Sequence, residues 1–247
     1  MTQYRFLAPL MEHGDARPFP GWVQQPEIHQ TELLDTATAR ELADIILSAH
    51  LAGQSFASRT RYAANTSWDV NGSFRSSKNI PTTLDGLATG FAAMQRYAEQ
   101  LMPAFGVDAK TYRLQPVNDQ CLLYQTGDYI RDHADDSALH DVDGQQVWRA
   151  IKPDRHLVGI VWLTSQHEQT ADRQADTLHA FEGGELQINS LVDVDTGAPL
   201  SICPQAGAMV LFPANPWYRH EVLPVRSGTR VALTRWWKIA LEAADET

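Results

Sequence analysis

Several features are scarce in this chain, and each scarcity excludes a class of protein. Only two cysteines, Cys121 and Cys203, occur in 247 residues, too few for a disulfide framework or a cysteine-rich zinc site. Isolated thiols are typical of a reducing compartment, so we expect a cytoplasmic protein. No apolar run is long enough to cross a bilayer, and the N-terminus lacks the apolar stretch of a secretory signal. We therefore expect no membrane partner.

Positive charge is also scarce. The chain has 20 Lys and Arg against 30 Asp and Glu, a formal net charge of −10. Because phosphate binding needs a basic surface, we expect no nucleic-acid partner. The hydrophobic fraction of 43% is enough for a full core. We expect a single domain over residues 1–247, with an N-terminal arm and supporting helices in 1–110 and the main β structure in 111–247.

Two amphipathic helices are predicted in the first half. Apolar residues recur at spacings of three and four over residues 35–51 and again over 83–102, where a proline follows. Thr38 stands three residues before a glutamate, which is the spacing of a capping box. Gly86 and Gly90 weaken the second helix and allow close packing against a sheet. We interpret both apolar stripes as core-facing surfaces.

From residue 111 the apolar periodicity shifts towards two, which favours short strands separated by turns. The predicted strands cover residues 122–124, 129–134, 157–164, 178–188, 200–202, 208–212, 219–225 and 230–237. This pattern indicates a mainly β fold with supporting helices, of the jelly-roll kind. Two polar stretches, 136–155 and 165–177, read as long loops that are either substrate lids or plain surface connections.

The candidate functional residues begin with His133 and Asp135. Residues two apart on a strand point to the same face, so an imidazole and a carboxylate would project into one cavity. His220 lies far downstream, and Arg230 follows it by ten residues. Two imidazoles and one carboxylate leave open positions on iron, the arrangement of non-heme Fe(II) oxygenases. The His-x-Asp tripeptide alone is a weak signal, because it is common by chance.

Five segments in order make the signal specific, and together they cover about residues 111–238. They are Tyr124-x-x-Gly-x-Tyr-x-x-x-His-x-Asp135, Arg155 leading into an apolar strand, Phe181-Glu-Gly-Gly-Glu-Leu186, Gly207-Ala-Met-Val-Leu-Phe212, and the stretch from His220 to Trp236. As a set they resemble the Fe(II)- and 2-oxoglutarate-dependent dioxygenases, specifically the prolyl-4-hydroxylase-like branch. Other histidines (His140, His156, His167 and His179) fall outside that pattern, and we interpret them as surface or packing residues.

The resemblance implies a double-stranded β-helix (cupin-like jelly roll) whose iron is held by His133, Asp135 and His220. It also implies that Arg230 binds the distal carboxylate of 2-oxoglutarate and that Tyr124 hydrogen-bonds the same group. The implied cofactors are Fe(II), 2-oxoglutarate and O2, with ascorbate as an addition in vitro. The implied reaction hydroxylates an unactivated C–H of a small molecule, amino acid or peptide, while 2-oxoglutarate is decarboxylated to succinate and CO2.

Elementary chemistry agrees with parts of this assignment. The guanidinium fork of Arg230 fits a carboxylate at two points, and small residues on the same strand face, Ala232 and Thr234, leave room for a diacid. The presence of Asp135 favours hydroxylation over halogenation, since related halogenases resemble this family but replace that carboxylate with a small residue.

Three residues are weaker candidates for substrate contact. Arg131 would share the metal's face in a regular strand, where it would meet an anionic substrate group or pair with the acidic loop. Trp236 would either close the base of the pocket or pack in the core. Arg75 loosely resembles a segment that borders the substrate groove in this branch.

A second function class stays open on the sequence. A non-enzymic, cupin-like protein that binds metal or a small ligand, or acts as a sensor, could also keep two histidines and an acid. It would have no reason to keep Arg230 at this spacing. The sequence encodes neither the substrate, small molecule or peptide, nor the oligomeric state.

Overall fold

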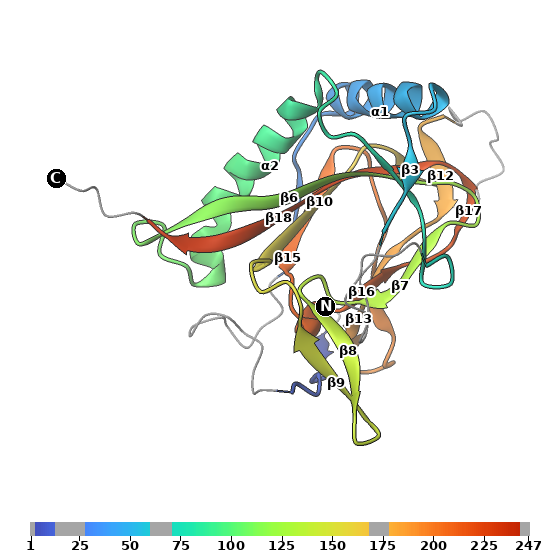
Figure 1. Cartoon of the computed structure of the whole chain (residues 1–247). Helices are drawn as coiled ribbons and strands as arrows, with labels where there is room; N and C mark the ends of the chain where they lie inside the picture. The colour runs from blue at the N-terminus through green and yellow to red at the C-terminus, as the bar shows by residue number, and fades with distance from the viewer. Residues whose placement is uncertain (1–2, 13–27, 60–70, 168–177, 243–247) are drawn as a thin grey trace.

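The structure is a computed structural model that describes residues 3–12, 28–59, 71–167 and 178–242 (Figure 1). Its helices are α1 (Thr36–Leu51) and α2 (Leu87–Leu101), with short 3-10 helices η1 (Met102–Phe105) and η2 (Pro216–Tyr218). None of the described helices is long and apolar enough to span a membrane.

Two sheets face each other and form the body of the fold (Figure 1). The larger sheet has the order β2 (His29–Glu32), β15 (Ala208–Pro213), β10 (Leu157–Trp162), β18 (Arg230–Leu241), β6 (Tyr112–Tyr124), β5 (Lys78–Ile80) and β3 (Phe56–Ala57). The smaller sheet has the order β1 (Tyr4–Phe6), β13 (Leu186–Asp193), β16 (His220–Val222), β7 (Tyr129–His133) and β4 (Arg75–Ser76), with β14 (Pro199–Ile202) also paired to β13.

Two smaller assemblies complete the strands. One is a three-stranded sheet of β11 (Ser165–Gln166), β12 (Ala180–Gly183) and β17 (Val225–Gly228), and the other is a hairpin of β8 (Ser137–Val142) and β9 (Gln145–Ala150). Only the β11–β12 pair among the described pairs of strands is parallel. The mainly β, double-stranded β-helix fold expected from the sequence is thereby confirmed.

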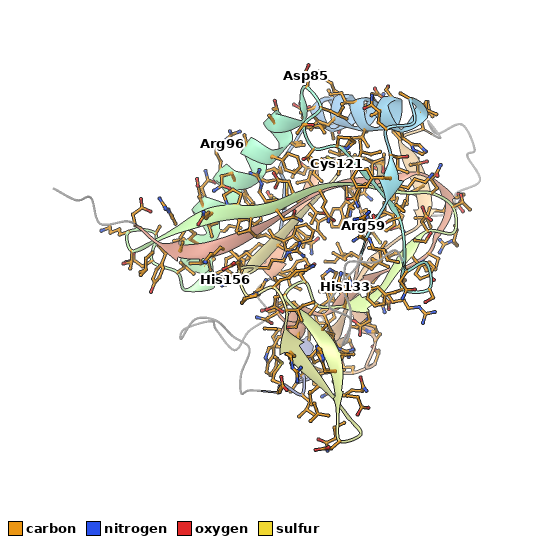
Figure 2. All side chains as sticks on the ribbon, in the orientation of Figure 1. Arg59, Asp85, Arg96, Cys121, His133 and His156 are labelled. Carbon is orange, nitrogen blue, oxygen red and sulfur yellow. The ribbon has the colours of Figure 1, made fainter. Side chains whose placement is uncertain are left out.

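Alternation along the central strands separates two apolar layers. On β10, Leu157 and Val161 face the helices, whereas Val158, Ile160 and Trp162 face the smaller sheet. Cys121 of β6 packs in the layer beneath the helices, and His133 lies on the other side of that sheet (Figure 2). The helix-side layer stabilises the larger sheet, and the inner layer surrounds the space between the sheets.

Both predicted helices exist, with corrections at their N-termini. Asp35, not Thr38, caps α1, because the Asp35 carboxylate accepts a hydrogen bond from the Thr38 backbone N–H at 2.7 Å. Helix α2 begins at Leu87, since Gly86 adopts a left-handed conformation with φ of 92° and stands before the helix. Gly90 does allow close packing: a Cβ there would lie 2.6 Å from Leu233 Cδ1.

The strand predictions are right in place and wrong mainly in length. β6 begins at Tyr112 rather than Leu122, and the predicted strand over 178–188 is divided between β12 and β13. The prediction of a loop over 136–155 is wrong, because β8 and β9 pair there as a hairpin. Most of its polar side chains are exposed, and the buried residues come as adjacent pairs, Ser137 with Ala138 and Val147 with Trp148. The sequence therefore lacks the period-two pattern that would have predicted these strands. Of the polar stretch 165–177, residues 168–177 lie outside the described residues.

Candidate metal centre

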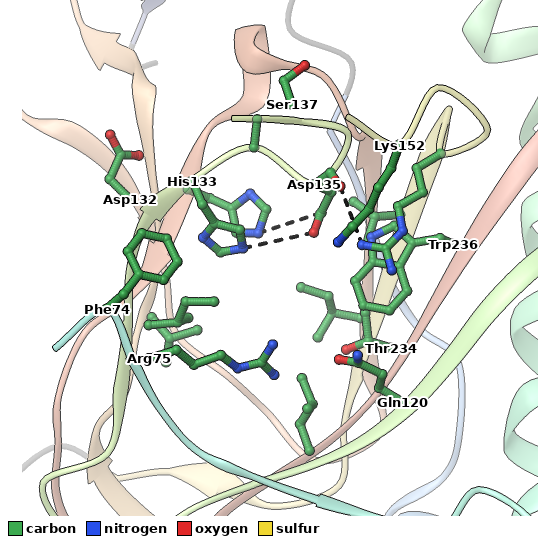
Figure 3. Close-up of a pocket in the computed structure, with 18 of the residues that line it drawn as sticks. Phe74, Arg75, Gln120, Asp132, His133, Asp135, Ser137, Lys152, Thr234 and Trp236 are labelled. Atoms are coloured by element: carbon green, nitrogen blue, oxygen red, sulfur yellow. Dashed lines mark hydrogen bonds and ion pairs between the residues drawn. The ribbon is translucent and has the colours of Figure 1, made fainter. Parts of the chain in front are cut away.

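A cavity of about 230 Å³ lies between the two sheets. Its walls come from β6, β10 and β18 on one side and from β7, β13 and β16 on the other. The β8–β9 hairpin contributes Ala138 and Trp148 to the same cavity. Polar and charged side chains line the cavity together with apolar ones (Figure 3).

Three of those polar groups converge at one point. His133 ends β7, Asp135 follows it by two residues, and His220 begins β16. One donor atom of each lies within 4.8 Å of the other two. His133 Nε2 is 3.9 Å from Asp135 Oδ1, and His220 Nε2 is 3.8 Å from Asp135 Oδ2. The register His220↔His133 between β16 and β7 brings these distant parts of the sequence together.

Backbone contacts fix the direction of each donor. His133 Nδ1 donates to the Arg131 carbonyl at 2.9 Å, and His220 Nδ1 donates to the Tyr218 carbonyl at 3.0 Å. Both Nε2 atoms are therefore left as acceptors aimed at the cavity. The backbone N–H of Asp135 donates to the Ala214 carbonyl at 3.0 Å. Asp135 Oδ2 is buried and has no hydrogen-bond partner among the described residues.

Burial and proximity set the charges of this group. Burial, followed by the nearby His220, lowers the pKa of His133 to about 3. Burial alone would raise the pKa of Asp135, but His220 and His133 outweigh it and hold that pKa below its usual value. The group thus presents a neutral His133 imidazole and an ionised carboxylate, the protonation states that bind a divalent cation.

Arg230 lines the same cavity from the first position of β18. Its side chain is 1% exposed, its Nε donates to the Gly184 carbonyl at 3.0 Å, and its guanidinium lies 5.0 Å from the Tyr124 ring centre. Its Nη2 has no hydrogen-bond partner within the described part of the chain. Burial lowers the pKa of Arg230 to about 10, so it remains charged at neutral pH. A buried cation with an unsatisfied donor calls for an anionic ligand.

Two glycines leave room for the Arg230 side chain. Gly183 and Gly184 have φ of 72° and 66°, and a bulge between Glu182 and Gly183 shifts the register with β17. A Cβ on Gly184 would lie 3.1 Å from Arg230 Cδ, so a side chain there would crowd the guanidinium. The two glycines thus form a bulge beside Arg230, and the Gly184 carbonyl orients the guanidinium.

The prediction that the Arg131 side chain shares the metal's face of its strand is wrong. Val222 pairs with Ile130 while His220 pairs with His133, so three steps on β7 oppose two on β16. This bulge puts Ile130 and His133 on the cavity side, and Arg131 is exposed and absent from the cavity lining. Strict alternation of side chains along the strand could not predict the extra residue that the bulge inserts into β7.

Both other weak candidates line the cavity. Arg75, on β4, is 9% exposed, and its guanidinium points into the cavity (Figure 3). Trp236 is 5% exposed, lines the cavity and belongs to the inner apolar layer, so both of its proposed positions hold at once. On β18, Arg230, Thr234 and Trp236 share the cavity face as alternation predicts.

Sequence reasoning missed Gln120 and Lys152 and did not give Arg155 a role in the cavity. Gln120 pairs with Thr234 across β6 and β18, so its position follows only from the register between distant strands. Lys152 and Arg155 follow the unpredicted hairpin. The position of Arg155 just before a strongly apolar strand was the one available signal.

The fold and this group of donors define a class: a double-stranded β-helix with two imidazoles and one carboxylate on one cavity wall. Residues 119–238 match the sequence model of the 2OG-Fe(II) oxygenase superfamily. This match, together with the fold and the three donors, supports a 2-oxoglutarate-dependent dioxygenase of the 2OG-Fe(II) oxygenase superfamily. Fe(II), 2-oxoglutarate and O2 are accordingly its cofactor and cosubstrates.

Solved structures share the fold at low sequence identity. A Pseudomonas putida prolyl-4-hydroxylase is 18% identical with a TM-score of 0.56, covering 86% of this chain and 92% of its own. A Trichoplax adhaerens prolyl hydroxylase, in complex with a hypoxia inducible factor oxygen degradation domain peptide fragment, is 13% identical with a TM-score of 0.59, covering 85% and 83%. A viral collagen prolyl hydroxylase from Paramecium Bursaria Chlorella virus-1, in a 2OG complex, is 17% identical with a TM-score of 0.50, covering 86% and 96%. No curated protein matches the chain.

Proposed function

We propose that this enzyme hydroxylates an unactivated C–H of a small molecule, amino acid or peptide. In this proposal His133, Asp135 and His220 hold Fe(II), while Arg230 and Tyr124 bind 2-oxoglutarate. The observation that carries it is the buried Arg230 guanidinium, whose Nη2 is unsatisfied by any described residue, in the same cavity as the three donors. A metal-binding protein without a diacid cosubstrate would leave that buried cation uncompensated.

The residues fit the groups that the superfamily requires. Two neutral nitrogen donors and a carboxylate suit Fe(II), and a buried guanidinium suits a carboxylate. When bound, iron, 2-oxoglutarate and O2 would supply the oxidative chemistry: one oxygen atom of O2 ends in succinate as CO2 leaves, and the other ends in the hydroxyl of the substrate.

The chain's own residues bind, orient and exclude water. Carbonyls of Arg131 and Tyr218 hold the two imidazoles in one tautomer, and the Gly184 carbonyl and the Tyr124 ring orient Arg230. Leu122, Val158 and Ile160 give the cavity an apolar wall that limits water near the reacting centre. No side chain needs to act as a general acid or base.

Anaerobic titration tests the assignment. Fe(II) and 2-oxoglutarate are added to the purified protein, and the weak visible charge-transfer band of the iron chelate is followed. Wild type should develop the band, His133→Ala should lose it, and Arg230→Ala should need more 2-oxoglutarate to reach it. Arg226→Ala is the matched control, because Arg226 is exposed on β17. A folded, metal-loaded wild type without the band would overturn the assignment and favour a binding protein instead.

A further inference from the structure

Cationic side chains gather around the cavity of this acidic chain. Besides Arg230, the lining includes Arg75, Lys152 and Arg155, with the exposed Arg59 also in contact with it. Such a concentration is unexpected in a protein with a net charge of −10. Like charges that face one cavity repel each other, so their arrangement needs a compensating anion.

Arg75 is the most buried of the three cations besides Arg230. Its Nε donates to Ser77 Oγ at 2.7 Å, and Ser77 Oγ in turn donates to Ser58 Oγ at 2.8 Å. These contacts hold the arginine stem and leave both Nη atoms without a hydrogen-bond partner in residues 3–12, 28–59, 71–167 and 178–242. With only 9% of the residue exposed, those donors are directed into the cavity (Figure 3).

Arg155 reaches the same space from the segment before β10. Its guanidinium stacks over the Trp236 ring at 4.0 Å, and its Nη1 donates to the backbone carbonyl of Asp135 at 3.3 Å. Burial lowers the pKa of Arg155 to about 10; the Asp135 and Asp136 carboxylates oppose this effect, and the positive charge of Arg75 adds to it. The two guanidinium groups are therefore close enough for electrostatic repulsion.

Metal and cosubstrate would not neutralise this pair. The two positive charges of Fe(II) and the one of Arg230 balance Asp135 and the two carboxylates of 2-oxoglutarate. The other carboxylate in the described lining, Asp132, is ion-paired with Arg219. Asp136, outside the described lining, partly offsets Arg155, whereas Arg75 would still face the cavity without an anion. A desolvated, uncompensated charge is unfavourable.

A neutral polar group lies in the same lining. Gln120 projects from β6 beside Thr234 (Figure 3), and its Oε1 is buried without a hydrogen-bond donor among the described residues. A substrate N–H or O–H would satisfy it.

We infer that the substrate is a compact molecule that carries a carboxylate and a hydrogen-bond donor. Arg75 and Arg155 bind the carboxylate, and Gln120 Oε1 accepts a hydrogen bond from the donor. This inference rests on the proposed function and names the substrate class of that site. A carboxylate matches the planar forks of two arginines. The described cavity of about 230 Å³ is below the usual range for ligand pockets and has to hold 2-oxoglutarate as well, which favours a compact substrate.

Ligand-observed NMR on the full chain tests the inference without turnover. The protein is loaded with Zn(II) in place of Fe(II) and with saturating 2-oxoglutarate, so that added acids do not compete for Arg230. The probes are the common L-amino acids and short-chain monocarboxylic acids, each compared with its primary amide. The variants are Arg75→Gln and Arg155→Gln, with Arg226→Gln as the matched control, because Arg226 is exposed on β17 and outside the described cavity lining.

The expected result is that at least one acid binds wild type about tenfold or more tightly than its amide, since a charge-assisted pair is lost in the amide. Both cavity variants should weaken binding of that acid by a similar factor. Their affinity for 2-oxoglutarate, and the binding of the acid to Arg226→Gln, should stay within about threefold of wild type. If Arg75→Gln does not fold, Arg75→Lys and Arg155→Gln carry the comparison.

Three results would overturn the inference: equal binding of acids and amides, no acid binding to the loaded wild type, or variants that lose only 2-oxoglutarate. The last would assign the pair to the cosubstrate. Failure of wild type to bind 2-oxoglutarate at all would instead contradict the proposed function, so the two failures are distinguishable.

Discussion

At the scale of single residues, Arg230 shows why the identity of a side chain matters as much as its charge. Its Nε is already used by the Gly184 carbonyl, and its Nη2 remains for a ligand. A lysine could supply the charge but not both contacts, because its ammonium is a single point on a flexible stem.

Arg230→Gln should raise the KM for 2-oxoglutarate by about 10- to 100-fold, the loss expected for one charge-assisted hydrogen bond of roughly 1.5–3 kcal/mol. The KM of Arg230→Lys should lie between those of Arg230→Gln and wild type. Succinate release at varied 2-oxoglutarate measures this, with Arg226→Gln as the exposed control. An unchanged KM in Arg230→Gln would mean that another cation binds the cosubstrate.

His156 is a packing residue, as its position outside the family pattern suggested. Its Nδ1 accepts the Ile239 backbone N–H at 2.9 Å, and its Nε2 donates to the Pro153 carbonyl at 3.0 Å. This pattern requires a neutral ring, since a protonated Nδ1 would face another donor. Burial accordingly lowers the pKa of His156 below its usual value of 6.5.

Because the folded pKa of His156 lies below the unfolded one, the unfolded chain binds the proton first as pH falls. The free energy of unfolding should therefore decrease as pH drops below about 6.5, by less than about 1.4 kcal/mol per pH unit, since partial solvent exposure weakens the effect. Urea unfolding of metal-free protein is measured from about pH 7.5 to about pH 5. Over this range the free energy of unfolding should decrease less for His156→Gln than for wild type. The exposed His167→Gln should match wild type.

At the scale of secondary-structure elements, the contact between α2 and the larger sheet depends on one small residue. A Cβ on Gly90 would lie 2.6 Å from Leu233 Cδ1 and 3.1 Å from Leu42 Cδ1, both in buried side chains. Helix propensity alone would favour alanine at this position by about 1 kcal/mol.

Packing should outweigh propensity here. Gly90→Val should lower the free energy of unfolding by about 1–3 kcal/mol through overpacking. Thr89→Ala, on the exposed side of α2, should not lower it. Chemical denaturation measures both variants. The double variant Gly90→Val with Leu233→Ala should be less destabilised than the sum of the single changes, and strict additivity would contradict the contact.

The β8–β9 hairpin is attached to the N-terminal segment. Arg149 pairs with Glu12 through two hydrogen bonds, and Trp148 forms backbone hydrogen bonds with Leu10 and Glu12. Trp148 also lines the cavity, so this attachment helps to hold one cavity wall.

Glu12→Gln should accelerate hydrogen exchange of the β8–β9 amides by a few-fold, in line with the small contribution of exposed ion pairs. Exchange in β10 and β18 should not change, because these strands lie in the middle of the larger sheet. Mass spectrometry of exchanged peptides resolves the two regions. Uniform acceleration would indicate a global loss of stability instead.

At the scale of the whole molecule, the three metal donors lie in the cavity between the two sheets and come together only in the folded chain. Ligands that bind only the folded chain stabilise it by mass action, by about 2.7 kcal/mol at a hundredfold excess over Kd. For a chain of this size that corresponds to a rise in Tm of roughly 5–10 °C.

Zn(II) or Mn(II) should raise the Tm of wild type by this amount, and a chelator should reverse the rise. His133→Ala and His220→Ala should lose most of it, whereas His167→Gln should keep it. Differential scanning calorimetry gives the comparison. An equal rise in His133→Ala would place the metal elsewhere.

Much of the fold and most of the site could be predicted from local patterns. Apolar spacing of three and four identified α1 and α2, and period-two runs located β7, β10 and β18. The ordered segments from Tyr124 to Trp236 identified the family and the residues His133, Asp135, His220 and Arg230, which the structure brings to one cavity. Local sequence suffices for these features, because helix faces, strand faces and short motifs repeat within a few residues.

The tertiary structure decided what depends on pairing between distant segments. The bulge between β7 and β16 turned Arg131 outwards, and the register of β6 with β18 set Gln120 beside Thr234. The hairpin over residues 137–150 was hidden because strand pairing, not local hydrophobicity, defines it. Arg75 and Arg155 are 80 positions apart (155 minus 75), and only the closing of two sheets around one cavity places both guanidinium groups there. Sequence patterns record which face a residue occupies, whereas long-range register decides what it meets.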